Sequence, residues 1–237
     1  MGGTPRVAAV SFRIPQSEFR IFLMGRRALP KIDPAVDWSG HFLSLDSLPS
    51  PWSAVELFGR EAPLEIEVGS GKGLFLQNAA LKNPDHIFLG VEVSLKYARF
   101  TAARLAKRQL ENARIVHGDA LRAFRELIPI DSLRAVHVYF PDPWWKARHH
   151  KRRVLNEAFL QDLVRTLEPG GRLHFWTDVR EYFDASLKLI AERTPLVGPL
   201  KVPEATPEHD LDYRTHFERR TRLHDEPVYR AEFEKRA

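Results

Sequence analysis

The chain has 237 residues, 43% of them hydrophobic, and a net charge of +5, so it can bury the core of one large domain with an extension or of two small domains. The absence of cysteine excludes disulfide bonds, thiolate catalysis, and zinc or iron–sulfur clusters held by cysteine. Because no apolar run approaches the roughly 18 residues of a membrane helix, and the N-terminus has no signal-peptide pattern, we expect a cytoplasmic protein with no membrane partner.

Residues 1–60 show no regular spacing of apolar residues. Six prolines interrupt them, among aromatic residues such as Phe12, Trp38 and Trp52. Proline removes backbone donors and ends regular elements. We therefore expect an irregular N-terminal extension over residues 1–60, packed on a domain of residues 61–237.

From Pro63 the pattern changes to short apolar runs that alternate with helical periodicity, which is typical of βαβ units. In chain order we expect a strand at 64–68, a helix at 73–82, a strand at 87–93, a helix at 94–110, a strand at 114–117, a short helix at 120–127, a strand at 135–140, a helix at 154–167, a strand at 172–177, a helix at 180–193, and an antiparallel hairpin of strands at 219–224 and 228–233. This order predicts an α/β fold that is Rossmann-like and doubly wound, with a mostly parallel seven-stranded sheet that ends in the antiparallel C-terminal hairpin.

A glycine-rich turn, Gly69-Ser70-Gly71-Lys72-Gly73, joins the first expected strand to the first helix. Glycine lets the backbone pass close to a ligand, and the N-terminus of a helix offers oriented N–H groups. The turn fits neither phosphate motif, because the dinucleotide fingerprint needs glycine where Leu74 stands and a P-loop needs Ser or Thr directly after Lys72. Gly69 and Gly71 are therefore candidates for contact with a nucleoside cofactor.

Acidic residues stand near the ends of three successive strands. Glu67 lies beside the glycine turn, and Glu92 lies where a carboxylate can accept both hydroxyls of a ribose. Asp119 follows the third strand and is placed to accept a hydrogen bond from an adenine amino group. The alternative is that such acids cap helices, which is a common role for a residue placed like Asp119. An acid-rich site without a phosphate cradle fits the sulfonium nucleoside S-adenosylmethionine better than it fits NAD.

The strand expected at 135–140 runs into Pro141-Asp142-Pro143, whose prolines remove two donors and end the pairing. Asp142 is therefore expected at the carboxyl end of a strand, where open α/β sheets bind ligands. Two tryptophans follow, and then the basic segment, residues 146–153, which holds five Lys or Arg and two His without a carboxylate. This order suggests a reaction centre that opens onto a polyanion. The alternative is an ordinary turn followed by a solvated charged face.

Two further groups of basic residues occur in the chain. The stretch up to Lys31 holds six basic residues and one acid, and the other group contains Arg214, Arg219, Arg220 and Arg222. If all three groups share a face, they suit the phosphate backbone of a nucleic acid, and the alternative is a charged surface with no such partner. The adjacent His149 and His150 have no acid nearby and make a poor ligand set, so we expect no metal.

These motifs resemble the bacterial tRNA (guanine-N7)-methyltransferase family over roughly residues 63 to 235. The matching segments are Glu67–Gly73, Gly90-Val-Glu92, Pro141–Lys146 with His149 and Lys151–Arg153, Thr177-Asp178, and Thr215-His-Phe-Glu218. The Pro-Asp-Pro-Trp block with its basic tail is the specific part, since the glycine turn alone implies only a class I methyltransferase. The resemblance implies the class I methyltransferase fold and the transfer of a methyl group from S-adenosylmethionine to N7 of the variable-loop guanine of tRNA, at position 46.

The resemblance also implies a set of site residues by motif match. For the cofactor these are Glu67, Glu92, Asp119 and Asp142, together with Gly69 and Gly71 of the turn. For the substrate they are Lys146, Asp178, Thr215, His216, Phe217 and Glu218. Asp142 is the candidate catalytic residue. Arg148, Lys151, Arg152 and Arg153 are expected to bind tRNA phosphates without reading sequence.

The chemistry expected at this site is alignment rather than proton transfer. Guanine N7 carries a lone pair, so it can attack a methyl group without first losing a proton, and no strong general base is required. We expect Asp142 to hold the guanine through its N1–H and amino donors, or to offset the charge that appears on the purine, with help from Asp178. Trp144 or Trp145 is placed to stack on the base, with core packing as the alternative for at least one of them.

Three competing functions stay open on the sequence. The first is another class I methyltransferase that acts on a protein, a small molecule or a different RNA. The second is a noncatalytic RNA-binding protein with a vestigial nucleoside pocket. The third is a nicotinamide-dependent oxidoreductase, which Leu74 disfavours. The sequence also leaves open whether the protein is a monomer or a homodimer.

Overall fold

The computed structural model of the chain describes residues 29–50, 52–202, 215–224 and 226–236. Apart from residues 51, 203–214, 225 and 237, they include the compact unit Ile32–Ala237. The basic stretch before Lys31 lies almost entirely outside the described residues, and so does Arg214.

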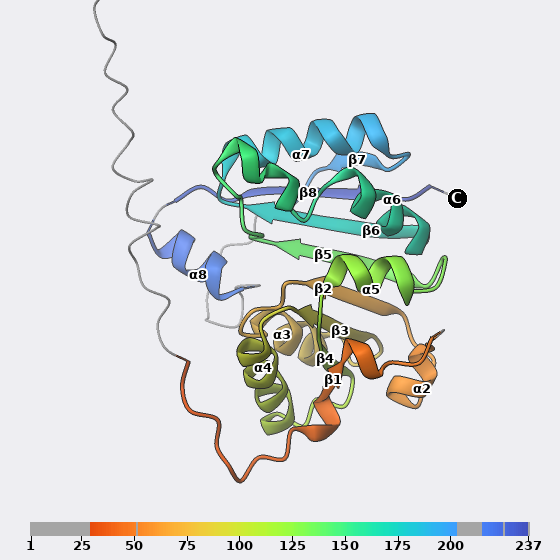
Figure 1. Cartoon of the computed structure of the whole chain (residues 1–237), viewed down its shortest axis with the longest axis vertical. Helices are drawn as coiled ribbons and strands as arrows, with labels where there is room; N and C mark the ends of the chain where they lie inside the picture. The colour runs from red at the N-terminus through yellow and green to blue at the C-terminus, as the bar shows by residue number, and fades with distance from the viewer. Residues whose placement is uncertain (1–28, 51, 203–214, 225, 237) are drawn as a thin grey trace, which may run out of the picture. The chain divides into compact units, whose positions relative to one another are not determined.

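An eight-stranded sheet forms the centre of the described unit (Figure 1). The strand order is β1-β4-β3-β2-β5-β6-β8-β7. Neighbours from β1 to β6 are parallel, and β8 is antiparallel to both β6 and β7. The strands are β1 (Phe42–Ser44), β2 (Leu64–Val68), β3 (Ile87–Glu92), β4 (Ala113–His117), β5 (Leu133–Tyr139), β6 (Leu167–Thr177), β7 (Val197–Leu200) and β8 (Tyr229–Glu234). The mostly parallel α/β fold is therefore confirmed, with one strand more than the sequence predicted.

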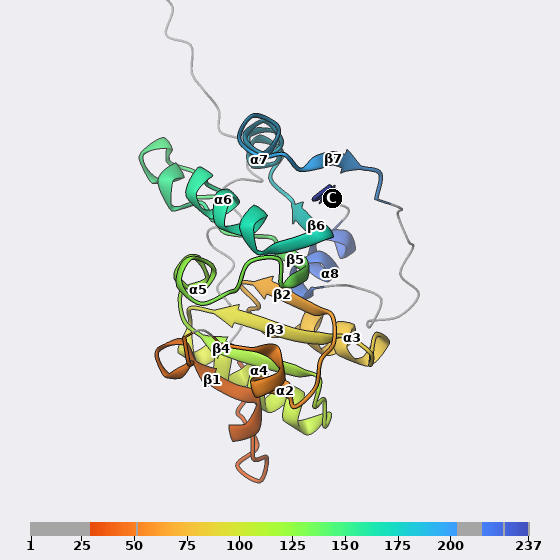
Figure 2. The same cartoon turned by 90° about the vertical axis from the view of Figure 1, so that its right-hand side faces the viewer.

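Helices cover both faces of the sheet (Figure 2). One face packs on α3 (Leu74–Lys82) and α4 (Leu95–Lys107) through an apolar cluster that includes Phe75 and Leu105. The other face packs on α5 (Ala120–Glu126), α6 (Glu157–Thr166) and α7 (Arg180–Arg193) through a cluster that includes Phe124 and Phe159. The shorter elements are η1 (Ser39–His41), η2 (Leu45–Ser47), α2 (Ala54–Phe58), η3 (Ala147–Arg152) and α8 (His216–Leu223).

The central strands are apolar because both of their faces are covered. All six residues of β3 are buried, which is typical of a parallel sheet between two layers of helices. The exception is β2, which reads Leu-Glu-Ile-Glu-Val and places two acids, Glu65 and Glu67, inside the sheet. Buried carboxyl groups need partners or a functional reason.

Residues 39–58 contain short regular elements within the segment expected to be irregular. Here β1 pairs in parallel with β4 at the edge of the sheet and supplies the eighth strand. The helix α2 begins with a capping box, in which the Ser53 side chain accepts from the backbone of Glu56 and the Glu56 side chain accepts from the backbone of Ser53. These elements attach the segment to the domain.

The strand predicted at 219–224 is wrong, because this segment forms α8. The Thr215 side chain accepts a hydrogen bond from the Glu218 backbone N–H at 2.9 Å and caps the start of the helix. The antiparallel pair at the end of the sheet is formed by β7 and β8 instead. A smaller difference lies in β6, which begins at Leu167 rather than at residue 172, because Leu167 pairs with Leu133 before a register shift.

The strand order reverses between β2 and β5. From β2 the chain continues to β3 and β4 on one side, and it then returns to β5 and β6 on the other. Because β2 to β6 are parallel, their carboxyl ends lie at one edge of the sheet, on the side where Figure 1 shows α8 and the arrowheads of β5 and β6. Open α/β sheets bind ligands at such a reversal.

Candidate active site

The glycine turn between β2 and α3 leaves open space above its backbone. Gly69 and Gly71 have φ values of +78° and +53°, and a Cβ added at either position would meet no heavy atom within 4 Å. Gly73 has φ +69°, and a Cβ there would lie within 3 Å of the Thr101 side chain on α4. The Gly69 N–H donates to the carbonyl of Val91 at 2.8 Å, which fixes the turn against β3. The turn therefore combines a fixed path with room for a ligand.

Glu92, the last residue of β3, has its carboxylate beside this turn. Its Oε2 accepts from the Gly71 N–H at 2.8 Å, and its Oε1 accepts from the Ser94 N–H at 2.8 Å. A carboxylate has about four lone-pair sites, so each oxygen can accept one more hydrogen bond. Glu92 is therefore held in place by the backbone and still has the capacity to accept two ribose hydroxyls.

Glu67 is buried at the carboxyl end of β2. The residue is 3% exposed, and its Oε2 is a buried atom without a hydrogen-bond partner in the described part of the chain. Burial raises the pKa of Glu67 to about 8; Ser70 opposes this increase through a hydrogen bond, and the carboxylate of Glu92 adds to it. A partner with positive charge would satisfy this group.

Asp119 lies at the third strand end and begins α5. Its Oδ1 accepts the Leu121 N–H at 2.9 Å, so the residue is the N-cap of the helix. The side chain is also exposed at the carboxyl edge of the sheet. This hydrogen bond therefore fixes the Asp119 carboxylate at the start of α5.

Asp142 is exposed in the turn that follows β5, next to β2 in the sheet. The residues on either side of the turn have unusual backbones, since Phe140 and Trp144 both have φ +48°. Such values are rare for bulky residues and cost on the order of 1–3 kcal/mol each. Positive φ at bulky residues is often found at functional sites, and here it brackets the candidate catalytic residue.

The carboxyl ends of β3, β2 and β5 therefore bring Glu92, Glu67 and Asp142 to one edge, with Asp119 one strand further along. Comparison with known proteins decides the family. Residues 61–231 match a family model described as "Putative methyltransferase". The chain is 46% identical to a tRNA (guanine-N(7)-)-methyltransferase of Rhodopirellula baltica over 98% of this chain and 88% of the relative. The chain belongs to the tRNA (guanine-N(7)-)-methyltransferase family.

Another relative, the tRNA (guanine-N(7)-)-methyltransferase of Legionella pneumophila strain Corby, is 37% identical over 75% of this chain and 79% of its own length. Solved structures agree on the fold. The 16S rRNA methyltransferase KamB matches with a TM-score of 0.57 at 18% identity, covering 77% of this chain and 92% of its own. An O-methyltransferase of Thermotoga maritima matches with a TM-score of 0.50 at 18% identity, covering 75% and 61%. The class I methyltransferase fold predicted from the sequence is therefore confirmed.

The substrate residues implied by the family lie on three segments around the Asp142 turn. Asp178 directly follows β6, which is the neighbour of β5. At the start of α8, the Phe217 ring contacts the Phe140 ring with 5.0 Å between centroids. Glu218 is 2% exposed and forms ion pairs with Arg222 and Arg230. The His216 side chain lies outside the described residues. The start of α8 thus packs directly against the turn.

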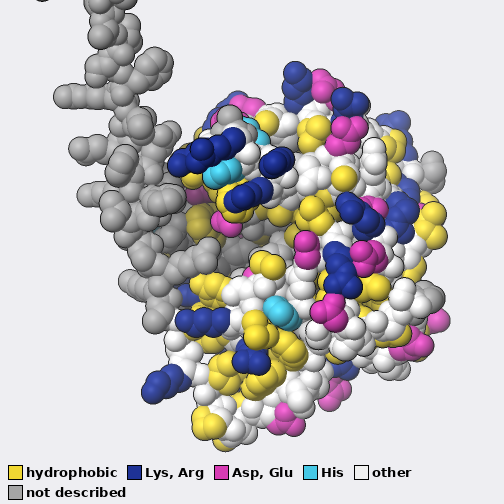
Figure 3. Space-filling view, in the orientation of Figure 1, with side chains coloured by type: hydrophobic (Ala, Val, Ile, Leu, Met, Phe, Trp, Pro, Cys, Tyr) yellow, Lys and Arg dark blue, Asp and Glu magenta, His cyan; other side chains and the backbone are white. Residues whose placement is uncertain are grey.

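The basic segment follows Asp142 and forms η3. Lys146, Arg148, Lys151 and Arg152 are exposed in it. Figure 3 shows Lys and Arg side chains with His beside them above a hollow in this face of the protein. Trp145 is 47% exposed, whereas Trp144 is held by the Arg152 guanidinium at 5.1 Å from its ring and by His149 at 5.9 Å. Trp145 is therefore the tryptophan more accessible to a base.

Arg153 differs from the rest of the basic segment because it is 6% exposed. Its guanidinium contacts the Glu181 carboxylate and the carbonyl of Pro143 rather than solvent.

In the described residues, no group of three or more His, Cys, Asp or Glu could hold a metal ion. No described helix is long and apolar enough to cross a membrane.

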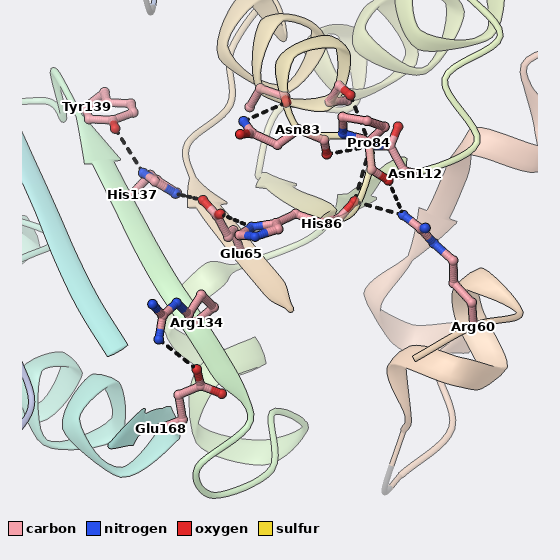
Figure 4. A network of polar contacts seen from close by, with 12 residues as sticks. Arg60, Glu65, Asn83, Pro84, His86, Asn112, Arg134, His137, Tyr139 and Glu168 are labelled. Carbon is pink, nitrogen blue, oxygen red and sulfur yellow. Dashed lines mark hydrogen bonds and ion pairs between the residues drawn. The ribbon is translucent and has the colours of Figure 1, made fainter. Parts of the chain in front are cut away.

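A partly buried chain of polar contacts, drawn in Figure 4, was not apparent from the sequence. Glu65 accepts from His86 Nδ1 at 2.6 Å and from His137 Nε2 at 2.6 Å, and His137 Nδ1 is 2.9 Å from the Tyr139 hydroxyl. Burial alone would raise the pKa of Glu65, but hydrogen bonds and charge from His137 and His86 lower it to about 2. The sequence shows Glu65 within an apolar strand, but it does not show which histidines contact it, because His86 and His137 lie elsewhere in the chain.

Proposed function

We propose that the chain methylates N7 of the variable-loop guanine of tRNA, at position 46, with S-adenosylmethionine as the methyl donor. The observation that supports this most is the meeting of two features at one edge of the sheet. Acids suited to a nucleoside end β2 and β3, and the exposed Asp142 turn with its basic segment follows the adjacent strand β5.

The residues around the glycine turn fit this cofactor. Glu92 would accept the ribose hydroxyls, and the open faces of Gly69 and Gly71 leave room for the backbone to approach the ligand. Asp119 would accept from the adenine amino group. Glu67 is a buried acid whose Oε2 has no hydrogen-bond partner among the described residues, which suits a ligand that carries positive charge. When bound, S-adenosylmethionine supplies an electrophilic methyl group.

The chain's own residues would then orient the guanine. Because N7 has a lone pair, the site needs alignment rather than a base, and such positioning can supply roughly 7–11 kcal/mol in favourable systems. Asp142 is exposed and can accept from the guanine N1–H and amino group, while Asp178 follows the neighbouring strand. Lys146, Arg148, Lys151 and Arg152 bind tRNA phosphates without reading sequence. A tRNA substrate also favours a cytoplasmic location.

The test is methylation of an unmodified tRNA transcript with labelled S-adenosylmethionine, followed by nucleoside analysis. The expected product is 7-methylguanosine, and a transcript with adenine in place of the variable-loop guanine should take up no label. Asp142→Ala should reduce turnover by 100-fold or more, on the order of what misalignment costs, while tRNA binding stays within about threefold. Label in another nucleoside, or none at all, would refute the proposed reaction, and full turnover by Asp142→Ala would refute the role of that residue.

A further inference from the structure

The turn that presents Asp142 needs contacts that hold it. Phe140 and Trp144 both adopt φ +48°, in the left-handed region that bulky side chains avoid. Such conformations persist only where the surroundings over-determine them. Phe140 is held at one side, because its N–H donates to the carbonyl of Trp176 at 2.8 Å. The contact at the other side comes from Arg153.

Arg153 reaches back over the turn with its whole guanidinium group. Its Nε donates to the carbonyl of Pro143 at 2.8 Å, the residue between Asp142 and Trp144. Its Nη1 and Nη2 donate to the two carboxylate oxygens of Glu181 on α7, at 3.2 and 2.8 Å. Its Nη2 is also 3.1 Å from Nε2 of His150. The fork geometry of arginine fits such two-point contact with a carboxylate.

The same group is shielded from solvent. The guanidinium carbon lies 4.6 Å from the centre of the Tyr182 ring, and Tyr182 is 1% exposed. The Tyr182 hydroxyl accepts the Leu155 N–H at 3.3 Å, which ties the chain after the basic segment to α7. The hydrogen bond from Arg153 lowers the pKa of Glu181. A buried cation with a charged partner is thus built into the base of the loop.

These contacts give Arg153 a different role from that of the neighbouring basic residues. Lys151 and Arg152 are exposed and can meet a phosphate, whereas all three nitrogens of Arg153 already have partners in the protein. A phosphate could reach Arg153 only by displacing Glu181 or the Pro143 carbonyl.

We propose that Arg153 is a positioning residue, which together with Glu181 fixes the turn that presents Asp142 to the substrate and does not bind tRNA phosphate. This inference rests on the proposed function, because Asp142 must act on the guanine for the turn to matter to the rate. It replaces the expectation that Arg153 belongs to the phosphate-binding group. Exact turn geometry matters because a misplacement of about 1 Å can cost 100-fold in rate.

The first experiment compares Arg153→Lys and Glu181→Gln with the exposed control Lys151→Ala. Arg153→Lys keeps the charge and loses the fork, so kcat should fall by about 10- to 100-fold while the Kd for tRNA and the salt dependence of binding stay as in the wild type. Glu181→Gln removes the charge of an exposed carboxylate, so kcat should fall by a smaller factor than in Arg153→Lys. The Kd for tRNA and the salt dependence of binding should again stay as in the wild type. Lys151→Ala removes an exposed phosphate contact, so it should weaken tRNA binding and reduce the salt slope by about one, which are the two quantities that Arg153→Lys leaves unchanged. If Arg153→Lys instead behaves like Lys151→Ala, the inference is overturned.

A second measurement does not depend on methylation. The tryptophans are replaced by 5-fluorotryptophan, the ¹⁹F resonance of Trp144 is assigned with Trp144→Phe, and each variant is observed in the cofactor-free protein. The Trp144 resonance should shift or broaden in Arg153→Lys and Glu181→Gln and stay unchanged in Lys151→Ala. An unchanged Trp144 resonance in a folded Arg153→Lys protein would overturn the inference. If the wild type makes no 7-methylguanosine, the proposed function fails while this readout still reports whether Arg153 holds the turn.

Discussion

Glu65 and Glu67 lie two residues apart on β2, on the same face of the strand, yet their surroundings favour opposite charge states. Glu65 accepts from two histidines, and these contacts lower its pKa to about 2. For Glu67, burial raises the pKa to about 8, and the nearby Glu92 carboxylate adds to the increase. Glu65 therefore stabilises the fold above pH 4.5 and loses this effect as the pH falls toward 2. The raised pKa of Glu67 has the opposite effect, because the stability that its neutral form contributes is lost as the pH rises toward 8.

Glu67 should make the cofactor-free protein less stable as the pH rises from 4.5 to 8. In this window the unfolded chain has released the Glu67 proton and the folded chain still holds it, so the free energy of unfolding falls by up to about 1.4 kcal/mol per pH unit. Glu67→Gln stays neutral and keeps the shape, so its stability relative to the wild type should increase across this window. Urea unfolding at several pH values measures this. Parallel curves for the two proteins would show that Glu67 is ionised in the fold at pH 7.

Residue positions were easier to predict than residue states. The sequence placed Glu67, Glu92 and Asp142 at strand ends because strand order and apolar patterning are local signals. It could not show that Arg153 is buried, because five Lys and Arg in one segment look alike until the path of the turn is known. Helix capping by Asp119, which the sequence offered as an alternative role, is observed in the structure, whereas the ion pairs of Glu218 depend on geometry beyond spacing.

At the scale of elements, β3 and the glycine turn fit together at Gly90. A Cβ at this position would lie within 3 Å of side-chain atoms of Ser70 in the turn, Leu76 on α3 and Ile115 on β4. The close approach is possible only because β3 has a glycine where it crosses under the turn. The glycine turn therefore depends on a small residue in the neighbouring strand.

Gly90→Ala should reduce stability by about 1–3 kcal/mol, because the added methyl overfills a packed layer. It should also weaken binding of S-adenosylhomocysteine, since Ser70 must move. The matched control is Gly40→Ala, where an added Cβ meets no heavy atom within 4 Å. Urea unfolding and titration calorimetry report the two effects. If the two variants prove equally stable, the packing at Gly90 is looser than the structure indicates.

Two elements show why parts of the fold escaped prediction. β1 has only three residues, too few for a periodic signal, and exists because β4 offers it an edge. α8 had a signal, because Thr215 followed three residues later by Glu218 is the pattern of a capping box, but residues 219–224 were expected to form the first strand of a hairpin. The structure confirms that the Thr215 side chain caps this helix.

At the scale of the whole molecule, Lys235, which directly follows β8, links distant parts of the chain. Its Nζ donates to Asp131 Oδ1 at 2.6 Å and to the carbonyls of Val164 and Leu167 at 2.8 and 2.7 Å. These carbonyls lie at the end of α6 and the start of β6, where helix carbonyls have no partner within the helix. One side chain thus joins the end of β8 to a loop 104 residues earlier in the chain.

Lys235→Ala should lower the free energy of unfolding by about 1.5–3 kcal/mol, because a charged donor is lost and two partly buried hydrogen bonds to carbonyls are removed. Arg236→Ala is the control, since Arg236 is exposed and its change should stay within about 0.5 kcal/mol. Urea unfolding of both variants checks the difference. Equal stabilities would mean that solvent replaces Lys235 at no cost.

The reversal of strand order between β2 and β5 also separates two sets of proposed site residues along the sequence. Every residue proposed for the nucleoside except Asp142 precedes α5, and the described residues proposed for RNA follow β5. A single recombination crossover between these two elements would therefore transfer substrate choice as one continuous piece of gene. Such an exchange would keep Glu67, Glu92 and Asp119 from one parent, and Asp142 alone of the cofactor residues would arrive with the new substrate segment.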